Sequence, residues 1–292
     1  METKNYDLIS VIEDSMKGFS KGQKLIANFI INRYDKAAFM TAAKLGDEVG
    51  VSESTVVRFA NEIGYDGYPQ LQKELRKLIK SKLTSIQRME VSSDRIKDSN
   101  ILKSVLLSDM DKIKITLEEI DSKIFDNIVE SILNAKKIYI LGVRSSAPLA
   151  SFLGFYFNLI FNNVRLVHTT SVSEMFEQII YASKGDVMIG ISFPRYSLRT
   201  INAMKYAKKQ GSKVIAITDS NDSPLAENSD LALTARSDMA SFVDSLVAPF
   251  SVVNALILAI AMRRKDYVYD VFENLEKIWC EYGVYEKNDK NL

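Results

Sequence analysis

The spacing of hydrophobic residues divides this chain into two parts of different fold class. Residues 1–83 carry apolar positions at helical spacing, and no strand pattern appears before residue 136. Beyond it, short apolar runs alternate with helical stretches, and we expect strands at 138–141, 164–168, 186–191, 213–218 and 231–234. Strands that alternate with helices form parallel sheets covered on both faces. We therefore predict an α-helical domain followed by a doubly wound α/β domain (an αβα sandwich) with a five-stranded parallel sheet.

Length and local composition place the domain boundaries. A chain of 292 residues is long enough for two domains. Residues 84–100 are rich in Ser, Asp and Lys and poor in large apolar side chains, which is typical of a linker, and residues 101–134 are helical in pattern again. We predict a helical domain at 1–83, a linker and connecting helix at 84–120, and the α/β domain at 121–292.

Composition excludes several classes of site. The chain has one Cys (Cys280) and one His (His168), so a disulfide framework, a Cys-rich metal site and a two-His catalytic pair are all excluded. We expect neither a metal nor a cofactor. The N-terminus lacks the layout of a signal peptide, so we expect a cytoplasmic protein. The uncharged run at 246–262 is short for a membrane span and contains Pro249, and we expect it to form a buried helix.

Residues 41–64 have the layout of a helix-turn-helix. Thr41 is placed to cap a helix at 42–49, Gly50 suits the turn, and Ser52 is placed to cap a second helix that ends before Gly64. Small polar residues at the start of the second helix suit contacts with base edges and phosphates. One turn further along, Arg58 suits a guanine or a phosphate. The pattern alone also fits an ordinary helix-loop-helix in which Ser52 is only a cap.

Local charge favours DNA over that alternative. Lys plus Arg total 38 against 37 for Asp plus Glu in the whole chain, yet residues 68–88 hold six basic residues and a single acidic one. A basic stripe beside a helix-turn-helix suits contacts with phosphates, so the partner we predict for the helical domain is double-stranded operator DNA. The candidate DNA-binding residues are Thr41, Ser52, Glu53, Ser54, Thr55, Arg58, Tyr68, Lys73 and Lys77.

The N-terminal motifs resemble those of a known family. Residues 19–27 (FSKGQKLIA), 39–43 (FMTAA), 51–59 (VSESTVVRF) and 64–68 (GYDGY) are similar to the N-terminal domain of the RpiR (MurR/RpiR) family of bacterial transcriptional regulators. The similarity covers residues 1 to about 80. It implies that the helix from Ser52 to Ile63 is the recognition helix.

The α/β domain offers a candidate anion site where its strands end. Ligands of doubly wound sheets bind beyond the carboxyl ends of the strands, and phosphates suit helix N-termini. Ser145 and Ser146 follow the first predicted strand, and Ser192 and Ser197 follow the third, with Arg195 between them adding charge. Each Ser equally suits a simple helix cap. Asp244 and Ser245, just before the apolar helix, suit either sugar-hydroxyl contacts or capping.

These strand loops resemble those of a SIS (sugar isomerase) domain, the effector domain of RpiR-type regulators. The resemblance extends over nearly the whole chain and implies that Ser145, Ser146, Ser192 and Ser197 bind the phosphate of a sugar phosphate. The third loop departs from the commoner Ser-x-Ser-Gly-x-Thr pattern, because Pro194 and Arg195 stand in the Ser-Gly places. A hydroxyl is lost and a cation is gained, so an amino-sugar phosphate or a carboxylate-bearing sugar fits the altered loop.

Two functional classes remain open on the sequence. The resemblance implies a non-enzymatic regulator of sugar metabolism that forms a homodimer or tetramer through the SIS domain, with operator affinity controlled by the bound sugar phosphate. The alternative is a sugar-phosphate isomerase with an accessory helical domain. An isomerase needs a positioned base, and His168, Glu174 and Glu177 lie near the second strand end. An RNA-binding protein is not favoured, since the aromatic residues form no stacking platform.

Overall fold

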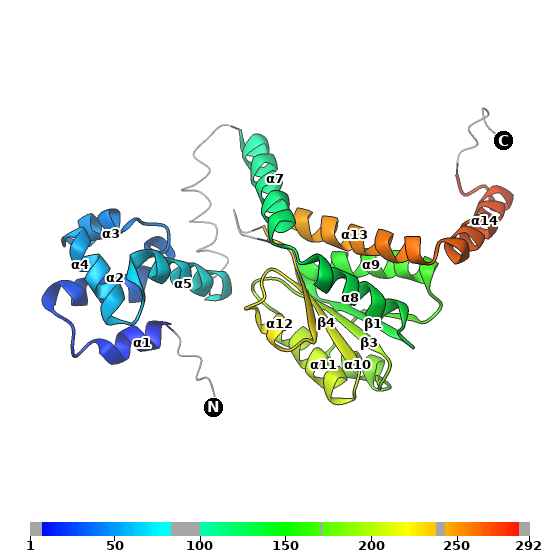
Figure 1. The fold of residues 1–292 in the computed structure, drawn as a ribbon, viewed down its shortest axis with the longest axis horizontal. Helices are drawn as coiled ribbons and strands as arrows, with labels where there is room; N and C mark the ends of the chain where they lie inside the picture. The colour runs from blue at the N-terminus through cyan, green and yellow to red at the C-terminus, as the bar shows by residue number, and fades with distance from the viewer. Residues whose placement is uncertain (1–7, 83–99, 170, 238–242, 286–292) are drawn as a thin grey trace. The chain divides into compact units, whose positions relative to one another are not determined.

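The computed structural model describes residues 8–82, 100–169, 171–237 and 243–285, and it divides into two compact units between Ile101 and Leu102. Figure 1 shows the first unit in blue and cyan and the second in green to red. The helical part and the α/β part predicted from the sequence are both present. Each unit has its own hydrophobic core and is described separately below.

The first unit is a bundle of short helices. In chain order these are α1 (Leu8–Ser15), α2 (Lys21–Ala37), α3 (Ala42–Val49), α4 (Glu53–Glu62) and α5 (Gly67–Lys82). The α2 helix begins with a capping box, in which the Ser20 Oγ accepts from the Gln23 backbone N–H and the Gln23 Oε1 accepts from the Ser20 N–H at 2.9 Å. The caps predicted at Thr41 and Ser52 are confirmed. The fully buried core side chains are Ile12, Ile26, Ile30, Leu45, Val56, Phe59, Leu71 and Leu75.

The turn between α3 and α4 depends on two glycines. Gly50 has a φ of 73°, in the left-handed region that favours glycine. Gly46 has a different role, because a Cβ added there would lie 2.7 Å from the carbonyl oxygen of Val51. The backbone after the turn therefore packs directly on the helix before it, which fixes the angle at which α4 leaves the turn.

We predict that Gly46→Ala destabilises the first unit by about 1–3 kcal/mol, because the new methyl group meets backbone that cannot move aside. Chemical denaturation of the full chain, followed by circular dichroism, measures the change. Gly18→Ala is the matched control, since its Cβ would lie 3.6 Å from the nearest atom, the Ser15 carbonyl oxygen. Equal stability of the Gly46→Ala variant and the parent would contradict this account of the turn.

The second unit has a five-stranded, entirely parallel sheet, as predicted. Its strands are β1 (Ile138–Gly142), β2 (Val164–Val167), β3 (Val187–Ile191), β4 (Lys213–Thr218) and β5 (Leu231–Thr234), in the order β2-β1-β3-β4-β5. The helices are α7 (Ile101–Glu119), α8 (Ser122–Leu133), α9 (Ala147–Ile160), α10 (Val172–Ile179), α11 (Leu198–Lys209), α12 (Pro224–Glu227), α13 (Val247–Arg263) and α14 (Lys265–Tyr282).

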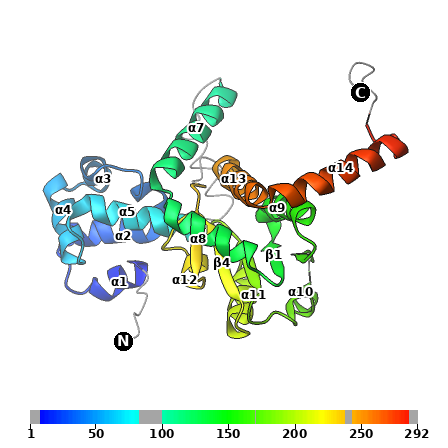
Figure 2. The same cartoon turned by 45° about the vertical axis from the view of Figure 1, so that its right-hand side comes forward.

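Alternation along the strands divides the core of this unit into two layers. On one face, Ile138, Ile140 and Ile189 pack against apolar residues of α8, α9 and α13. On the other face, Tyr139 and Met188 pack against α10, α11 and α12. Figures 1 and 2 show these helices covering the sheet from both sides. Helices on both faces explain why the strands are nearly continuous apolar runs.

The order of the strands fixes where a ligand site can form. The chain moves from β1 outward to β2, and then returns past β1 to β3 on its other side. The connections after β1 and β3 therefore leave the sheet in opposite directions and open a crevice beyond the strand ends, the usual ligand position in such folds. The Ser-bearing loops predicted as the ligand site are the two that flank this switch point.

The apolar run at 246–262 forms α13, whose Val253, Leu256 and Ile260 are fully buried in the core of the second unit. The expectation of a buried helix is confirmed. In the part of the chain that the structure describes, no single helix has the length and apolar character of a membrane span. The α13–α14 pair passes by length and composition only when its two helices are taken together, and they are bent by 98°.

Candidate functional site

The start of α4 presents a cluster of hydroxyl groups to solvent. The Ser52 Oγ accepts from the Thr55 backbone N–H at 3.3 Å and lies 2.9 Å from the Ser54 Oγ and 2.8 Å from the Thr55 Oγ1. Ser52, Glu53 and Ser54 are exposed, and Thr55 is half-buried. Ser52 therefore acts as a cap, and its exposed hydroxyl leaves the same end of the helix open to a DNA backbone.

Arg58 extends this surface by one turn. Its side chain is exposed, and its Nε donates to the Ser54 carbonyl oxygen at 3.3 Å, which holds the guanidinium beside the hydroxyl cluster. Val56 and Phe59 point the other way and are fully buried, as their apolar character predicts. The α4 helix thus has one face in the core and one polar face that carries a cation, the arrangement a recognition helix needs.

Thr41 and Tyr68 prove to have structural roles. The Thr41 Oγ1 accepts from the Lys44 N–H at 3.2 Å, so this exposed residue caps α3. Tyr68 is buried. Its hydroxyl shares its proton between the carbonyl oxygens of Ala37, at 3.0 Å, and Met40, at 3.1 Å. The structure gives Tyr68 a packing role, and its contact with DNA stays a prediction. Its hydroxyl ties α5 to the end of α2.

The basic stripe is only partly described. Lys73 is exposed on α5, where it is free to face a phosphate. The backbone of Lys77 belongs to the same helix, but its side chain is outside the described part of the structure. The same holds for the side chains of Arg76, Lys80 and Lys82. Arg88 also lies outside the described residues. The stripe as a whole therefore stays a prediction.

The loop after β1 is a tight turn that requires glycine. A Cβ on Gly142 would lie 2.6 Å from the Ser146 carbonyl oxygen, so the chain folds back closely over the strand end. Arg144 has a φ of 56°, in the left-handed region that non-glycine residues rarely adopt. The turn leaves Ser145 exposed and Ser146 buried, directly before α9. The Ser145 hydroxyl has no hydrogen-bond partner among the described residues, so it is available to a ligand.

The loop after β3 joins two of the predicted residues. Ser192 is buried, and its Oγ accepts from the Ser197 backbone N–H at 3.0 Å. Ser197 caps α11, its Oγ accepting from the Thr200 N–H at 3.3 Å. Since β1 and β3 are adjacent and in register, with Gly142 opposite Ile191, this loop lies beside the Ser145 turn. The structure thus brings the two serine loops together at one sheet edge.

Thr200 is a residue that the sequence reasoning missed. It is fully buried in the first turn of α11, and its Oγ1 has no hydrogen-bond partner. A buried hydroxyl without a partner costs free energy. The Thr200 hydroxyl is such a group, and it lies next to the Ser197 cap. Its position three residues after Ser197 is the only sequence signal that points to it.

Arg195 and the end of β4 complete this edge. Arg195 is exposed in the loop between Ser192 and Ser197, so one loop carries both a cation and two of the serines. The next residue, Tyr196, donates from its hydroxyl to the Asp219 Oδ1 at 2.8 Å and so ties the β3 loop to the β4 loop. The edge therefore combines hydroxyls, a cation and a helix N-terminus, a combination suited to a phosphate.

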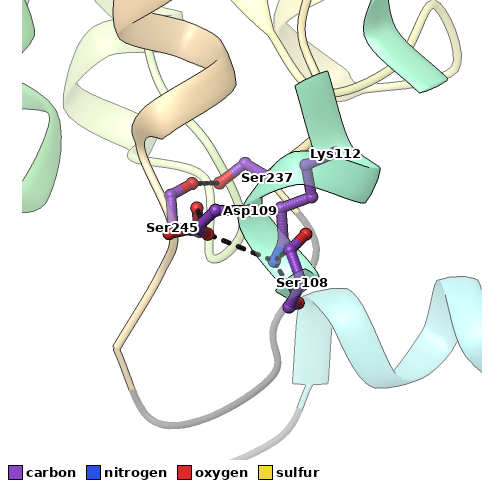
Figure 3. A network of polar contacts seen from close by, with 5 residues as sticks. All are labelled: Ser108, Asp109, Lys112, Ser237 and Ser245. Atoms are coloured by element: carbon purple, nitrogen blue, oxygen red, sulfur yellow. Dashed lines mark hydrogen bonds and ion pairs between the residues drawn. The ribbon is translucent and has the colours of Figure 1, made fainter. Parts of the chain in front are cut away.

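Asp244 and Ser245 lie after β5, where Ser245 joins a polar network with α7 (Figure 3). The Ser245 Oγ donates to the Asp109 Oδ1 at 2.6 Å, and its backbone carbonyl accepts from the Ser237 hydroxyl at 3.0 Å. Lys112 is buried within the network, its Nζ 3.6 Å from the Asp109 Oδ1 and 2.7 Å from the Ser108 Oγ. Ser245 is therefore engaged with α7, and Asp244 is half-buried beside it.

A second contact fixes the carboxyl end of α7 to the same loop. The Arg236 backbone N–H donates to the Thr116 Oγ1 at 2.9 Å, and the Arg236 guanidinium forms a two-pronged ion pair with Glu119. The α7 helix is thus attached to the β5–α13 loop by polar contacts. We call the five residues Ser108, Asp109, Lys112, Ser237 and Ser245 the α7 latch.

We predict that Asp109→Ala destabilises the second unit by about 1–3 kcal/mol, because it leaves the buried Lys112 ammonium without its carboxylate. Thermal or chemical unfolding measures this. Asp109→Ala combined with Lys112→Met regains most of the loss, since no buried charge is then left unpaired. Asp111→Ala, an exposed change on the same helix, is the control. If Asp109→Ala is as stable as Asp111→Ala, the latch does not hold α7.

The candidate bases for catalysis lie at the end of β2. His168 is exposed, and its backbone N–H donates to the Gln178 Oε1 at 3.3 Å. Glu174 accepts a short hydrogen bond from Thr169, and Glu177 lies on α10. The Tyr139 phenol is inside the core on the α10–α11 face, and burial raises its pKa. None of these groups joins the serine loops in a hydrogen bond among the described residues.

A hollow of about 630 Å³ lies at the opposite edge of the sheet. It is lined by Asn127, Asp186 and Lys213, among others, of which the last two stand before or at the beginning of strands. Because ligands of doubly wound sheets bind beyond the carboxyl ends, this open hollow is a weaker candidate than the serine loops. The site we assign therefore rests on the strand order and the loop geometry.

Two family profiles match the chain, one in each unit. The profile described as "Helix-turn-helix domain, rpiR family" matches residues 6–82, and the one described as "SIS domain" matches residues 131–259. Together the two matches cover more than two thirds of the chain. The chain belongs to the RpiR family. Its α4 is therefore the second helix of an RpiR-type helix-turn-helix, and its sheet is the sheet of a SIS domain.

Relatives of this RpiR-family chain are transcriptional regulators. It is 27% identical over 232 residues to an uncharacterised HTH-type transcriptional regulator of Clostridium perfringens, covering 78% of this chain and 81% of the relative. It is 22% identical over 276 residues to another from Caldanaerobacter subterraneus, covering 93% of this chain and 96% of the relative. This RpiR-family chain is thus an HTH-type transcriptional regulator with a SIS domain.

Solved structures share its fold. The sugar isomerase domain of an RpiR transcription factor from Sphaerobacter thermophilus is 26% identical, with a TM-score of 0.58 over 61% of this chain and 99% of that one. NanR of Vibrio vulnificus, complexed with ManNAc-6P, is 21% identical, with a TM-score of 0.59 over 94% of this chain and 99% of that one. The predicted RpiR-type architecture is confirmed.

Proposed function

We propose that this protein binds operator DNA through α4 and that a phosphorylated sugar, bound at the serine loops of the SIS domain, controls its operator affinity. The observation that carries the proposal is the pairing of the Ser145 and Ser192 loops at the switch point of the sheet, each at the start of a helix. A phosphate there meets backbone N–H groups, hydroxyls and the cation of Arg195 together.

The polar face of α4 supports the DNA half of the proposal. Ser52, Ser54 and Arg58 are exposed on one helix surface whose other side is buried. In a dimer, two such helices enter successive major grooves of a palindromic operator, about 34–36 Å apart. Lys73 and Lys77 then extend the contacts to the phosphate backbone.

The sugar class is proposed from the departure in the third loop. Pro194 and Arg195 replace the commoner Ser-Gly pair, which leaves one hydroxyl fewer and one guanidinium more. A guanidinium forms paired hydrogen bonds with a carboxylate and donates single ones to the carbonyl oxygen of an amide, so a sugar that carries either group beside its phosphate suits this loop. The relative NanR, solved with ManNAc-6P, supports the amino-sugar side of this choice.

A regulator fits better than an isomerase. Isomerisation needs a base within hydrogen-bond reach of the substrate carbon. Near β2 the Glu174 carboxylate is bonded to Thr169, and neither His168 nor Glu177 has a hydrogen bond to the serine loops among the described residues. We therefore propose that the SIS domain binds its ligand without turnover. The protein is proposed to act as a homodimer in the cytoplasm, and the exposed Leu258 and Met262 of α13, with Phe155 of α9, are candidates for contact between SIS domains.

A thermal-shift screen against phosphorylated sugars tests the proposal. A ligand at one hundred times its Kd adds about 2.7 kcal/mol of stability. The expected hits are amino-sugar or acidic sugar phosphates, and their unphosphorylated counterparts should give no shift. Each hit is then incubated with the protein and analysed for conversion. Stabilisation without phosphate, or turnover of a bound sugar phosphate, would contradict the proposed function.

A further inference from the structure

The α7 helix presents its apolar side to solvent. Leu102, Leu106, Met110, Ile113 and Leu117 follow one another at spacings of four, four, three and four residues, so they form one stripe along the helix. Their exposed fractions range from 38% to 75%. The side that packs against the rest of the unit is polar instead, with Lys112 and Thr116 buried. An amphipathic helix normally has the reverse orientation.

The α7 latch explains why the stripe cannot turn inward. Asp109, Lys112 and Thr116 lie on one face of the helix, and each is bonded to a neighbour at the β5–α13 loop or within the latch. Rotating the helix to bury the stripe would break these contacts. Their partners on the β5–α13 loop would then lie against apolar side chains without hydrogen bonds. The outward orientation of the apolar stripe is therefore fixed by specific bonds. Figures 1 and 2 both show the amino end of α7 standing away from the sheet.

A stripe of this size indicates a protein contact. Five half-exposed large side chains present several hundred Å² of apolar surface, and patches of that size on soluble proteins mark interaction sites. A stable dimer buries about 800 Å² per partner. The stripe alone falls short of this area, so it suits one part of a larger interface, such as the dimer proposed above.

Four of the five stripe residues match when the helix is reversed. Reversal about the point between Asp109 and Met110 places Leu102 on Leu117 and Leu106 on Ile113, and Met110 is the residue next to that point. A two-fold axis produces this kind of self-matching contact, in which residue i meets residue j and residue j meets residue i. The charges agree with it, since an antiparallel pair brings the amino end with Lys103 near the partner's carboxyl end, which in this chain carries a glutamate at position 118.

We propose that α7 pairs in antiparallel orientation with α7 of a second copy of this chain, with Met110 of each copy next to the two-fold axis. This inference rests on the proposed dimer and names a surface that the SIS fold does not supply. Because α7 follows the linker directly, the pairing would join the two copies at the point where each chain enters its SIS domain. The latch then connects this contact to the loop that carries Asp244 and Ser245.

Disulfide cross-linking of the full chain tests the pairing. In a Cys280→Ser background, Leu106→Cys combined with Ile113→Cys should give an air-oxidised dimer, because position 106 of one copy would face position 113 of the other. Each single variant should fail to cross-link, since seven residues of helix separate the introduced thiol from its equivalent in the other copy by about 10 Å. Cross-linking of the single variants alone would indicate a parallel contact and would overturn the proposal.

Charge variants at Met110 exclude other occupants of the stripe. Met110→Glu and Met110→Lys should each weaken self-association at least tenfold in sedimentation, and mixing them should restore it. A site for the same chain's helical domain or for another protein would not respond to mixing, and that result would overturn the proposal. Ser104→Glu, on the opposite side of the helix, is the matched control. A parent that sediments as a monomer contradicts the proposed dimer as well, whereas a dimeric parent without cross-links contradicts only the α7 pairing.

Discussion

Replacing Ser145 and Ser192 together by Ala is expected to abolish the response to sugar phosphates and leave DNA binding intact. In the proposed site each hydroxyl donates a hydrogen bond to the phosphate, and a hydrogen bond to a charged group contributes about 1.5–3 kcal/mol. Loss of both therefore weakens ligand binding by a factor of at least about one hundred. Isothermal titration with a sugar phosphate from the thermal-shift screen measures the change, and operator titration measures the DNA affinity.

The single variants separate binding from structure. Ser145 is exposed and has no partner among the described residues, so Ser145→Ala removes a ligand contact without a structural loss. Ser192→Ala also removes the acceptor for the Ser197 N–H, so its stability is to be measured beside its affinity. Ser151→Ala, an exposed change on α9, is the control. Undiminished ligand affinity in the double variant would remove the serine loops from the site.

Replacing Arg58 by Ala is expected to weaken operator binding by about 1–3 kcal/mol and leave ligand affinity unchanged. The guanidinium is exposed on the polar face of α4, one turn from the hydroxyl cluster, and it is the only basic side chain within that helix. A helix in the major groove presents such a residue to a guanine or a phosphate. Fluorescence anisotropy with a selected operator fragment measures the loss.

Two further variants interpret the result. Arg58→Lys keeps the charge and loses the two-pronged geometry. A contact with a base is therefore lost in Arg58→Ala and in Arg58→Lys alike, whereas a contact with a phosphate largely survives in Arg58→Lys. Removing a phosphate contact also reduces the salt dependence of binding, by the release of about one counterion. Lys277→Ala, an exposed basic residue on α14, controls for net charge. Wild-type affinity of Arg58→Ala would mean that α4 does not read this DNA.

Local signals predicted most of the secondary structure. Thr41 and Ser52 cap helices as their positions predict, because a cap depends only on residues within one turn. The five strands begin and end within a residue or so of the predicted ranges, since each is a short apolar run bounded by polar residues or glycine. The Ser145 and Ser192 loops also lie side by side as expected, because the carboxyl ends of adjacent parallel strands meet at the same end of the sheet.

Long-range packing decided what the sequence could not. Tyr68 carries a polar hydroxyl in a basic region, and only the positions of the Ala37 and Met40 carbonyls show that it faces inward. The periodicity of α7 predicts a helix but not which side is buried, because the Asp109 that pairs with Lys112 is itself held by a serine more than one hundred residues away. Thr200 has no motif of its own, and its buried hydroxyl is visible only in the fold.

The most direct test of the account is operator affinity measured with and without the sugar phosphate. Fragments selected from a random duplex library by the full-length protein serve as the operator, and anisotropy gives the Kd. The account predicts that the bound sugar phosphate changes this Kd by about 5–150-fold, whereas the unphosphorylated sugar leaves it unchanged. A sugar phosphate that binds the SIS domain tightly and leaves operator affinity unchanged would contradict the central claim.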